Sequence, residues 1–288
     1  MSRSLPISPA VRVSVIIGLG VLVGLILGLT GAGGAILAVP LLIFALNWDV
    51  ARSAPVALVA VAASAALGAA IGLRQGSVRY RAAIIMAVGG ALMTPLGLYL
   101  AHRAPVAPLA LVFSAVLLYV AWRMYRQTRP ITARAAADLG GVCEVPAGPH
   151  SAPCQLNRST GRFVWNAPCA KALALSGLAT GLLSGLLGVG GGFVIVPALR
   201  HTTDLPMNSI VATSLLVVAL VSAFAVASSA LTGHLELSIA WPFAVGALLG
   251  MIAGRAVAPK IAGPRLQQGF AALTALAAVG LIVKTLHR

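Results

Sequence analysis

Acidic side chains are scarce in this chain: five Asp and Glu stand among 288 residues, and charged residues of either sign make up 9%. Soluble domains carry roughly 25% charged residues, so this composition cannot supply a water-exposed surface. Hydrophobic residues make up 59% of the chain, and apolar runs of about 20 residues, enough to cross ~30 Å of hydrocarbon, recur along it. The sequence predicts an all-α polytopic integral membrane protein in a lipid bilayer, with no separate soluble domain.

The positions of the five acidic residues exclude further classes. Asp49, Asp204 and Glu236 stand at the ends of apolar runs, whereas Asp138 and Glu144 stand in a polar stretch. A carboxylate inside the membrane is costly, and cation pumps and many proton-coupled carriers keep one there for a task. Its absence from the middle of every run favours an anionic solute over a cation.

Histidine and cysteine give no metal or catalytic pattern. Cys143 and Cys154 are too far apart for the two-to-four-residue spacing of a zinc site, and no HExxH motif is present. No metal, cofactor or catalytic residue is predicted. With Cys169, the cysteines all fall in or beside one polar stretch, so no disulfide framework is implied. We expect unpaired, incidental thiols, with a reaction toward sulfur compounds as the alternative.

Positive charge is abundant, with 20 Lys and Arg and a net charge of +15. In a soluble protein this balance would indicate nucleic acid, but here the basic residues stand between apolar runs, as orientation signals do. No nucleic-acid partner is therefore predicted. Most of the basic residues fall on one side of the membrane if every run, short ones included, reverses the chain. That side holds the polar stretch 123–168, which is predicted to be cytoplasmic.

The chain divides into two membrane-embedded repeats. Residues 1–122 form the first repeat, 123–168 the polar central loop and 169–288 the second repeat. Each half contains four full-length apolar segments and one short segment beside a glycine cluster. Five segments is an odd number, so the two halves should be inverted relative to each other, as in many secondary transporters.

A constant offset of 157 residues (185 minus 28) relates the two halves without a gap. It aligns Gly28 with Gly185, Gly31 with Gly188, Gly33 with Gly190, Gly34 with Gly191, Pro40 with Pro197, Gly76 with Gly233, Gly89 with Gly246 and Gly97 with Gly254. Apolar sequences match easily by chance, but a gapless register that keeps glycine on glycine does not. The pattern indicates an internal duplication.

The two glycine clusters are the main candidate site. Each should break its helix, because glycine costs ~1 kcal/mol relative to alanine in a helix interior. In a membrane such a break is tolerated where the backbone is buried in protein or lines a wet cavity, and a restarting helix offers unpaired N–H groups to an anion. The candidate substrate-binding residues here are Thr30, Gly31, Gly33, Gly34, Gly188, Gly190, Gly191 and Gly192. The alternative is that these glycines only let helices pack closely.

Hydroxyl side chains are the second candidate. Thr213 and Ser214 lie near the start of an apolar run and could donate to an anion without adding charge. Equally, they could cap the helix or bond to the preceding turn. Ser64, Ser222, Ser228 and Ser229 are weaker candidates, since helix packing is the usual role of such serines.

These motifs resemble those of the TauE/SafE sulfite exporter family, also called TSUP. The resemblance depends on the paired Gly-x-Gly-Gly clusters, each followed by a proline (Gly31–Pro40 and Gly188–Pro197). Ala212-Thr213-Ser214-Leu215 and the glycines at 76 and 233 support it. It implies a multi-pass carrier in the bacterial inner membrane, usually of eight helices, for small sulfur-containing anions such as sulfite and sulfonates.

The sequence therefore predicts a secondary transporter of small anions that works by alternating access, with a homodimer as a possible assembly. A passive anion channel is the alternative function. A membrane-embedded enzyme is not expected, because no nucleophile–base pair or metal set stands at membrane depth. Direction of transport and coupling ion do not follow from the residues.

Overall fold

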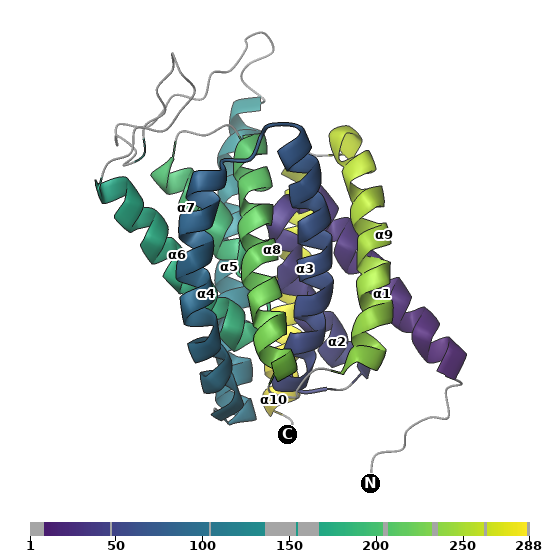
Figure 1. The fold of residues 1–288 in the computed structure, drawn as a ribbon. Coiled ribbons are helices and arrows are strands. Elements are labelled where there is room, and N and C mark those ends of the chain that lie inside the picture. Colours follow the sequence, from purple (N-terminus) through teal and green to yellow (C-terminus); the bar gives the residue numbers. More distant parts are fainter. Residues whose placement is uncertain are drawn as a thin grey trace.

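The structure is a computed structural model that describes residues 9–46, 48–103, 105–135, 154, 167–203, 207–231, 236–261 and 264–286. Every regular element within these ranges is a helix (Figure 1). The first half contains α1 (Pro9–Thr30), the 3₁₀ helix η1 (Gly31–Leu37), α2 (Ala38–Leu46), α3 (Val50–Arg74), α4 (Tyr80–Arg103) and α5 (Val106–Ala135). The second half contains α6 (Ala167–Leu187), α7 (Gly192–Thr202), α8 (Met207–Leu231), α9 (Leu237–Ile261) and α10 (Pro264–Leu286).

Six helices contain a stretch long and apolar enough to cross a membrane, among the residues that the structure describes: α1, α3, α4, α6, α8 and α9. Helices α5 and α10 add shorter apolar stretches, Pro108–Trp122 and Ala271–Thr285. The prediction of an all-α, multi-pass membrane protein is confirmed. Helix α5 continues to Ala135, so the first part of the predicted polar loop is helical, and most of that loop lies outside the described residues.

Glycines let two pairs of helices approach very closely. Gly20, Gly24 and Gly28 of α1 lie directly on the backbone of α9, and a Cβ atom at Gly24 would stand 1.9 Å from the carbonyl oxygen of Ala247. In the same way, a Cβ atom at Gly181 of α6 would stand 2.0 Å from the carbonyl oxygen of Gly90 in α4. In lipid, helices associate largely through van der Waals packing, which small residues allow to be close, so these two pairs are tightly packed parts of the bundle.

The pairing of the helices follows the sequence duplication. The offset of 157 relates α1 to α6 and α4 to α9. The contacting pair α1–α9 therefore corresponds to the contacting pair α6–α4, and both contacts are extensive. The same offset relates α3 to α8 and α5 to α10, and the two members of each of these pairs pack against each other. In Figure 1, α1 begins at the bottom beside the N-terminus and α6 begins at the top, so the two run in opposite directions.

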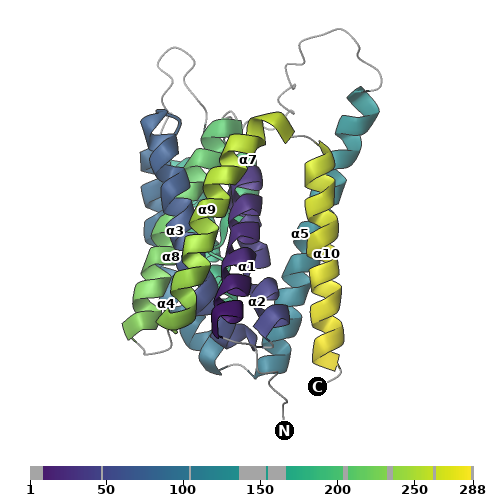
Figure 2. The same cartoon turned by 90° about the vertical axis from the view of Figure 1, so that its right-hand side faces the viewer.

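Helices α5 and α10 lie side by side at one edge of the molecule (Figure 2). Their main contact is with each other. Near its C-terminal end α10 also reaches α2, where Lys284 donates a hydrogen bond to the carbonyl oxygen of Ile43 at 3.0 Å and its ammonium group lies 5.9 Å from the centre of the Phe44 ring. One helix from each half therefore forms a separate two-helix layer against the other helices.

We predict that Gly24→Ala destabilises the protein by about 1–3 kcal/mol, the usual cost of overpacking. The added methyl group would meet the backbone of α9, which cannot move aside as a flexible side chain could. Thermal unfolding of the purified protein in detergent measures the effect. Gly18→Ala is the matched control, because Gly18 lies in the same helix with nothing within 4 Å of an added Cβ atom. Equal melting temperatures for the two variants would contradict this packing.

Candidate functional site

The second glycine cluster forms a tight turn between α6 and α7. Gly188, Gly190 and Gly191 have φ angles of 68°, 69° and 66°, in the left-handed region that other residues avoid at a cost of roughly 1–2 kcal/mol. The amide of Gly188 donates to the carbonyl oxygen of Ser184 at 2.9 Å, and the carbonyl oxygen of Gly191 accepts from the amides of Val194 and Ile195. The predicted break is present here, and α7 restarts at Gly192.

This turn lies deep in the bundle, between α3 and α8. A Cβ atom at Gly190 would stand 2.9 Å from Val61 and 3.2 Å from Val218, and both valines are about midway along their helices. A Cβ atom at Gly188 would stand 2.5 Å from the Cα atom of Ala54. All residues of the turn are buried. Gly190 is therefore at mid-helix depth, where many transporters bind their solutes, and Gly188 lies closer to the N-terminal end of α3.

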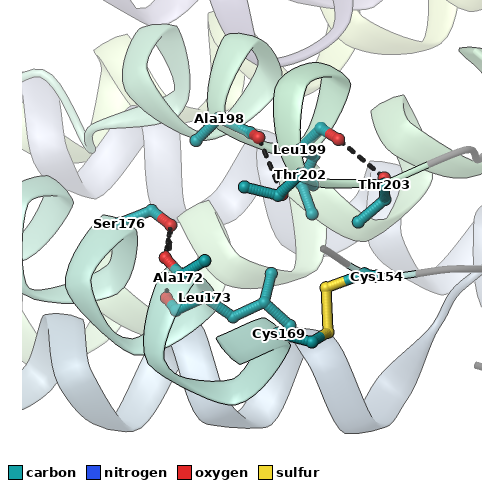
Figure 3. The surroundings of a disulfide bond; sticks show 9 residues. All are labelled: Cys154, Cys169, Ala172, Leu173, Ser176, Ala198, Leu199, Thr202 and Thr203. Carbon is teal, nitrogen blue, oxygen red and sulfur yellow. Dashed lines mark hydrogen bonds between the residues drawn. A yellow bond between two sulfur atoms is a disulfide. The ribbon is translucent and has the colours of Figure 1, made fainter. Parts of the chain in front are cut away.

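Helices α6 and α7 form a hairpin whose two ends lie on the same face. A disulfide joins Cys154 to Cys169, at the start of α6 (Figure 3). The amide of Cys154 also donates to the carbonyl oxygen of Thr202, at the end of α7. The same face carries Arg79, whose amide bonds to α8 near its N-terminus, together with Arg74 and Arg200. We call it the basic face. The glycine turn is the inner tip of this hairpin.

The expectation of unpaired cysteines is wrong for two of the three. Cys154 and Cys169 have Cα atoms 4.9 Å apart and are bonded. Spacing alone could not indicate this pair, because the approach of Cys154 depends on the folded α6–α7 hairpin. Cys143 lies outside the described residues.

One unpartnered serine hydroxyl group lies against the turn, and three more belong to the helices that enclose it. Among the described side chains, Ser53, Ser64, Ser184 and Ser222 are fully buried, with hydroxyl oxygens that have no hydrogen-bond partner. The Oγ atom of Ser222 would stand 2.7 Å from a Cβ atom at Gly190. The other three are close in sequence to residues that contact or bond to the turn. Buried hydroxyl groups are normally satisfied, so four unpartnered ones here indicate a place for a hydrogen-bonding ligand.

Two of these serines were not predicted. Ser64 and Ser222 are weak candidates from sequence, whereas Ser53 and Ser184 carry no sequence signal that separates them from the other serines of apolar helices. Their link to the turn is spatial: Ser53 precedes Ala54, which touches Gly188, and Ser184 is one helical turn before Gly188.

The first glycine cluster differs from the prediction of an unwound stretch. Residues Gly31–Leu37, which include Gly33 and Gly34, form the 3₁₀ helix η1 and continue directly into α2. In a 3₁₀ helix the backbone hydrogen bonds join residues three apart and stay within the helix, and a 3₁₀ helix of 7 residues is unusually long. Alanine at position 35, where the second half has Gly192, is one difference between the two clusters. Helix η1 packs against α7 and α8, so the first cluster lies beside the helix that follows the second.

The predicted hydroxyl residues are used elsewhere. Thr30 donates to the carbonyl oxygen of Ile26 at 2.7 Å, and Ser214 donates to that of Val211 at 2.8 Å. The hydroxyl oxygen of Thr213 accepts from the amide of Arg79 at 3.0 Å, which ties α8 to the start of α4. Thr213 is nine residues, or about 14 Å of helix, from Ser222. The bond of Ser214 matches the back-bonding alternative, whereas Thr213 bonds to another segment instead of its own helix.

Comparison with known proteins decides the family. The family model described as "Sulfite exporter TauE/SafE" matches residues 16–281, which is nearly the whole chain. The chain belongs to the TauE/SafE sulfite exporter family. The resemblance read from the glycine–proline motifs is confirmed, and the membrane transporter class follows from it.

Two relatives of this TauE/SafE protein come from Xylella fastidiosa. The one from strain 9a5c is 31% identical over 252 residues, and the one from strain Temecula1 / ATCC 700964 is 31% identical over 254 residues. Each alignment covers 87% of both chains, and each relative is named "Probable membrane transporter protein". No solved structure matches this chain.

The fold holds Cys154 and Cys169 in position to form their disulfide, and we predict that a reducing cytoplasm keeps the pair as thiols in growing cells until an oxidant closes the bond. The bridge lies on the basic face, which the charge bias assigns to the cytoplasm, and disulfides are rare in that compartment. Cells are denatured directly in a maleimide-linked polymer, which labels free thiols. The gel shift of the protein is then compared with and without reductant, and Cys154→Ser is the control. A bridge already complete in growing cells would contradict the cytoplasmic assignment of this face.

Proposed function

We propose that this protein is a secondary transporter of small sulfur-containing anions, such as sulfite or sulfonates, in a bacterial inner membrane. The observation that carries the proposal is the buried Gly188–Gly191 turn with its four unpartnered serine hydroxyls. Membership of the TauE/SafE family supports the sulfur-containing solute. We also propose that the two halves are inverted repeats. The offset of 157 supports this, because it relates the contacting helix pair α1–α9 to the contacting helix pair α6–α4.

The chemistry of the turn suits an oxyanion. Serine hydroxyls can donate, and the amides of Gly192 and Phe193, in the first turn of α7, have no acceptor within that helix. The positive end of the helix dipole favours negative charge at the same point. Among the described residues the carboxylates are Asp49 and Glu236, at the starts of α3 and α9. Asp49 stands five residues, or about 8 Å of helix, before Ala54, which borders Gly188, so no described acid lies within the turn itself.

We propose alternating access as the mechanism, with the glycine turn, α7 and η1 between more rigid parts. The glycine-packed pairs α1–α9 and α4–α6 would move as units, while the turn between α3 and α8 holds the solute. A passive anion channel is the second candidate, because the same donors could line a continuous pore.

Transport by purified protein in liposomes separates these two functions. We expect uptake of radioactive sulfite that saturates, and exchange that accelerates when unlabelled sulfite is trapped inside. A carrier gives both results, because its binding site must be occupied by solute before it can turn back to the other side of the membrane. Flux that rises linearly with concentration and shows no exchange would indicate the channel, and absence of any sulfite or sulfonate flux would contradict both.

We predict that Ser222→Ala weakens the apparent affinity for sulfite about 5- to 10-fold without lowering the melting temperature. Removing a buried hydroxyl that has no partner takes nothing from the folded protein, but removes a donor to the solute. Ser228→Ala is the matched control in α8, since Ser228 is exposed and donates to the carbonyl oxygen of Phe224 at 2.9 Å. Unchanged affinity in Ser222→Ala would show that this hydroxyl does not touch the solute.

A further inference from the structure

The end of α7 is held by a residue that comes before α6 in the chain. The amide of Cys154 donates to the carbonyl oxygen of Thr202 at 3.0 Å, and Cys154 forms a parallel β-bridge with Thr203. The last four carbonyl groups of a helix have no donor within that helix, so Cys154 supplies a donor that α7 lacks. Because Cys154 is also bonded to Cys169, it connects the end of α7 to the start of α6.

Two threonine side chains bond back into the last turn of α7. The Oγ1 atom of Thr202 donates to the carbonyl oxygen of Ala198 at 2.8 Å, and that of Thr203 donates to the carbonyl oxygen of Leu199 at 2.6 Å (Figure 3). The amide of Thr203 donates to the same oxygen of Leu199 at 2.9 Å. Helix α7 has 11 residues, or about 16 Å of helix, so a restraint on its end acts on the whole segment back to the glycine turn.

The other partner of the disulfide belongs to a tightly packed helix pair. Cys169 is the third residue of α6. A Cβ atom at Gly177 would overlap the backbone of Met86, and one at Gly185 would overlap the backbone of Thr94. These contacts lie along α6 and hold it directly on α4. The disulfide therefore attaches Cys154 to the α4–α6 pair.

Helix α7 has a different relation to that pair. At its inner end it follows the glycine turn, in which Gly188, Gly190 and Gly191 have φ angles of 68°, 69° and 66°. Glycine is the residue that changes backbone conformation at the lowest steric cost, so this turn can serve as a hinge. Along its length α7 also packs against η1 and α8, which lie outside the α4–α6 pair. The contacts of Cys154 restrain the end of α7 that is farthest from the hinge.

These restraining contacts are buried. Cys154 and Cys169 have no exposed surface, and Thr203 is 4% exposed. Breaking a buried hydrogen bond leaves an unpaired amide and an unpaired carbonyl group in a medium of low dielectric constant, which costs more than breaking one in water. A closed disulfide that keeps Cys154 beside α6 therefore keeps the end of α7 there as well. All three cysteines of the chain follow residue 142, so the first repeat has no equivalent bond.

We propose that Cys154 and Cys169 form a thiol–disulfide switch that controls transport. With the bond closed, α7 is clamped to the α4–α6 pair and the transport cycle stops. With the bond open, Cys154 moves with the end of α7 and the cycle proceeds. This inference rests on the proposed function, because it assumes that α7 moves during transport.

The oxidant that closes the switch is a low-molecular-weight disulfide such as oxidised glutathione. The two protein thiols lose two electrons and two protons as the bond between Cys154 and Cys169 forms. The sulfur–sulfur bond of the oxidant accepts them and breaks, which gives two small thiols. The reverse exchange, with two small thiols as the reductant, opens the switch.

The test compares two preparations of purified wild-type protein in liposomes, one oxidised with oxidised glutathione and one reduced with dithiothreitol until the maleimide-polymer gel shift shows free thiols. Uptake of radioactive methanesulfonate is measured, because sulfite itself cleaves disulfide bonds. The oxidised protein should have a maximal rate at least tenfold lower, with KM within twofold, and reduction should restore the rate. Equal maximal rates in the two preparations would overturn the switch.

The three cysteine variants assign the effect to one bond. Cys154→Ser and Cys169→Ser should transport at the rate of the reduced wild-type protein after either treatment. Cys143→Ser is the matched control and should keep the tenfold response to oxidation. A slower rate of oxidised Cys154→Ser, or loss of the response in Cys143→Ser, would overturn the assignment to this pair.

Hydrogen exchange of the α7 amides tests the clamp without transport. The amides of residues 199–203 should exchange at least tenfold more slowly in the oxidised wild-type protein than in the reduced one, and Cys154→Ser should show no such difference. Equal exchange rates in the wild-type preparations would overturn the clamp. A protein that moves neither methanesulfonate nor sulfite in either state would overturn the proposed function and the control of transport, while the clamp itself would still stand or fall on these exchange rates.

Discussion

Hydrocarbon offers no hydrogen bonds to a backbone, so every interruption of a helix within the membrane must be enclosed by protein. The Gly188–Gly191 turn meets this constraint because α3, α6 and α8 close around it, touching it through Ala54, Thr180 and Val218. Only glycine permits both the left-handed angles and these close contacts. The turn, the α6–α7 hairpin and the surrounding serines all depend on this one enclosed interruption.

The duplicated sequence produces unequal sites. The second cluster is a left-handed turn, whereas the first is the 3₁₀ helix η1, which keeps its hydrogen bonds inside the segment. The unpartnered hydroxyls come from both halves, Ser53 and Ser64 from the first and Ser184 and Ser222 from the second, and none is matched by a hydroxyl at its duplicate position. Ser184 and Ser222 correspond to Leu27 and Ala65 in the first half, which carry no hydroxyl. The two halves therefore supply different side chains around the one left-handed turn, while η1 packs against α7 and α8.

Much of this fold could be predicted from the sequence, because its strongest signals are local. Apolar runs gave the spanning helices, and the register of glycines at 28, 89, 97 and their partners gave the duplication that the helix pairs follow. The contacts between distant segments could not be predicted. Thr213 bonds to Arg79 rather than lying at the turn, and Cys154 reaches Cys169 only in the folded hairpin. Ser53 and Ser184 look like packing serines until their neighbours in space are known.

The central claim, that the glycine turn and its serine hydroxyls hold an oxyanion, is most directly tested with selenite, a pyramidal oxyanion shaped like sulfite. Crystals of the protein soaked in selenite and measured at the selenium absorption edge locate the anion by anomalous scattering. The account predicts a selenium peak within hydrogen-bonding reach of Ser222 and the start of α7. Peaks confined to the molecular surface, with none beside Gly188–Gly191, would contradict it.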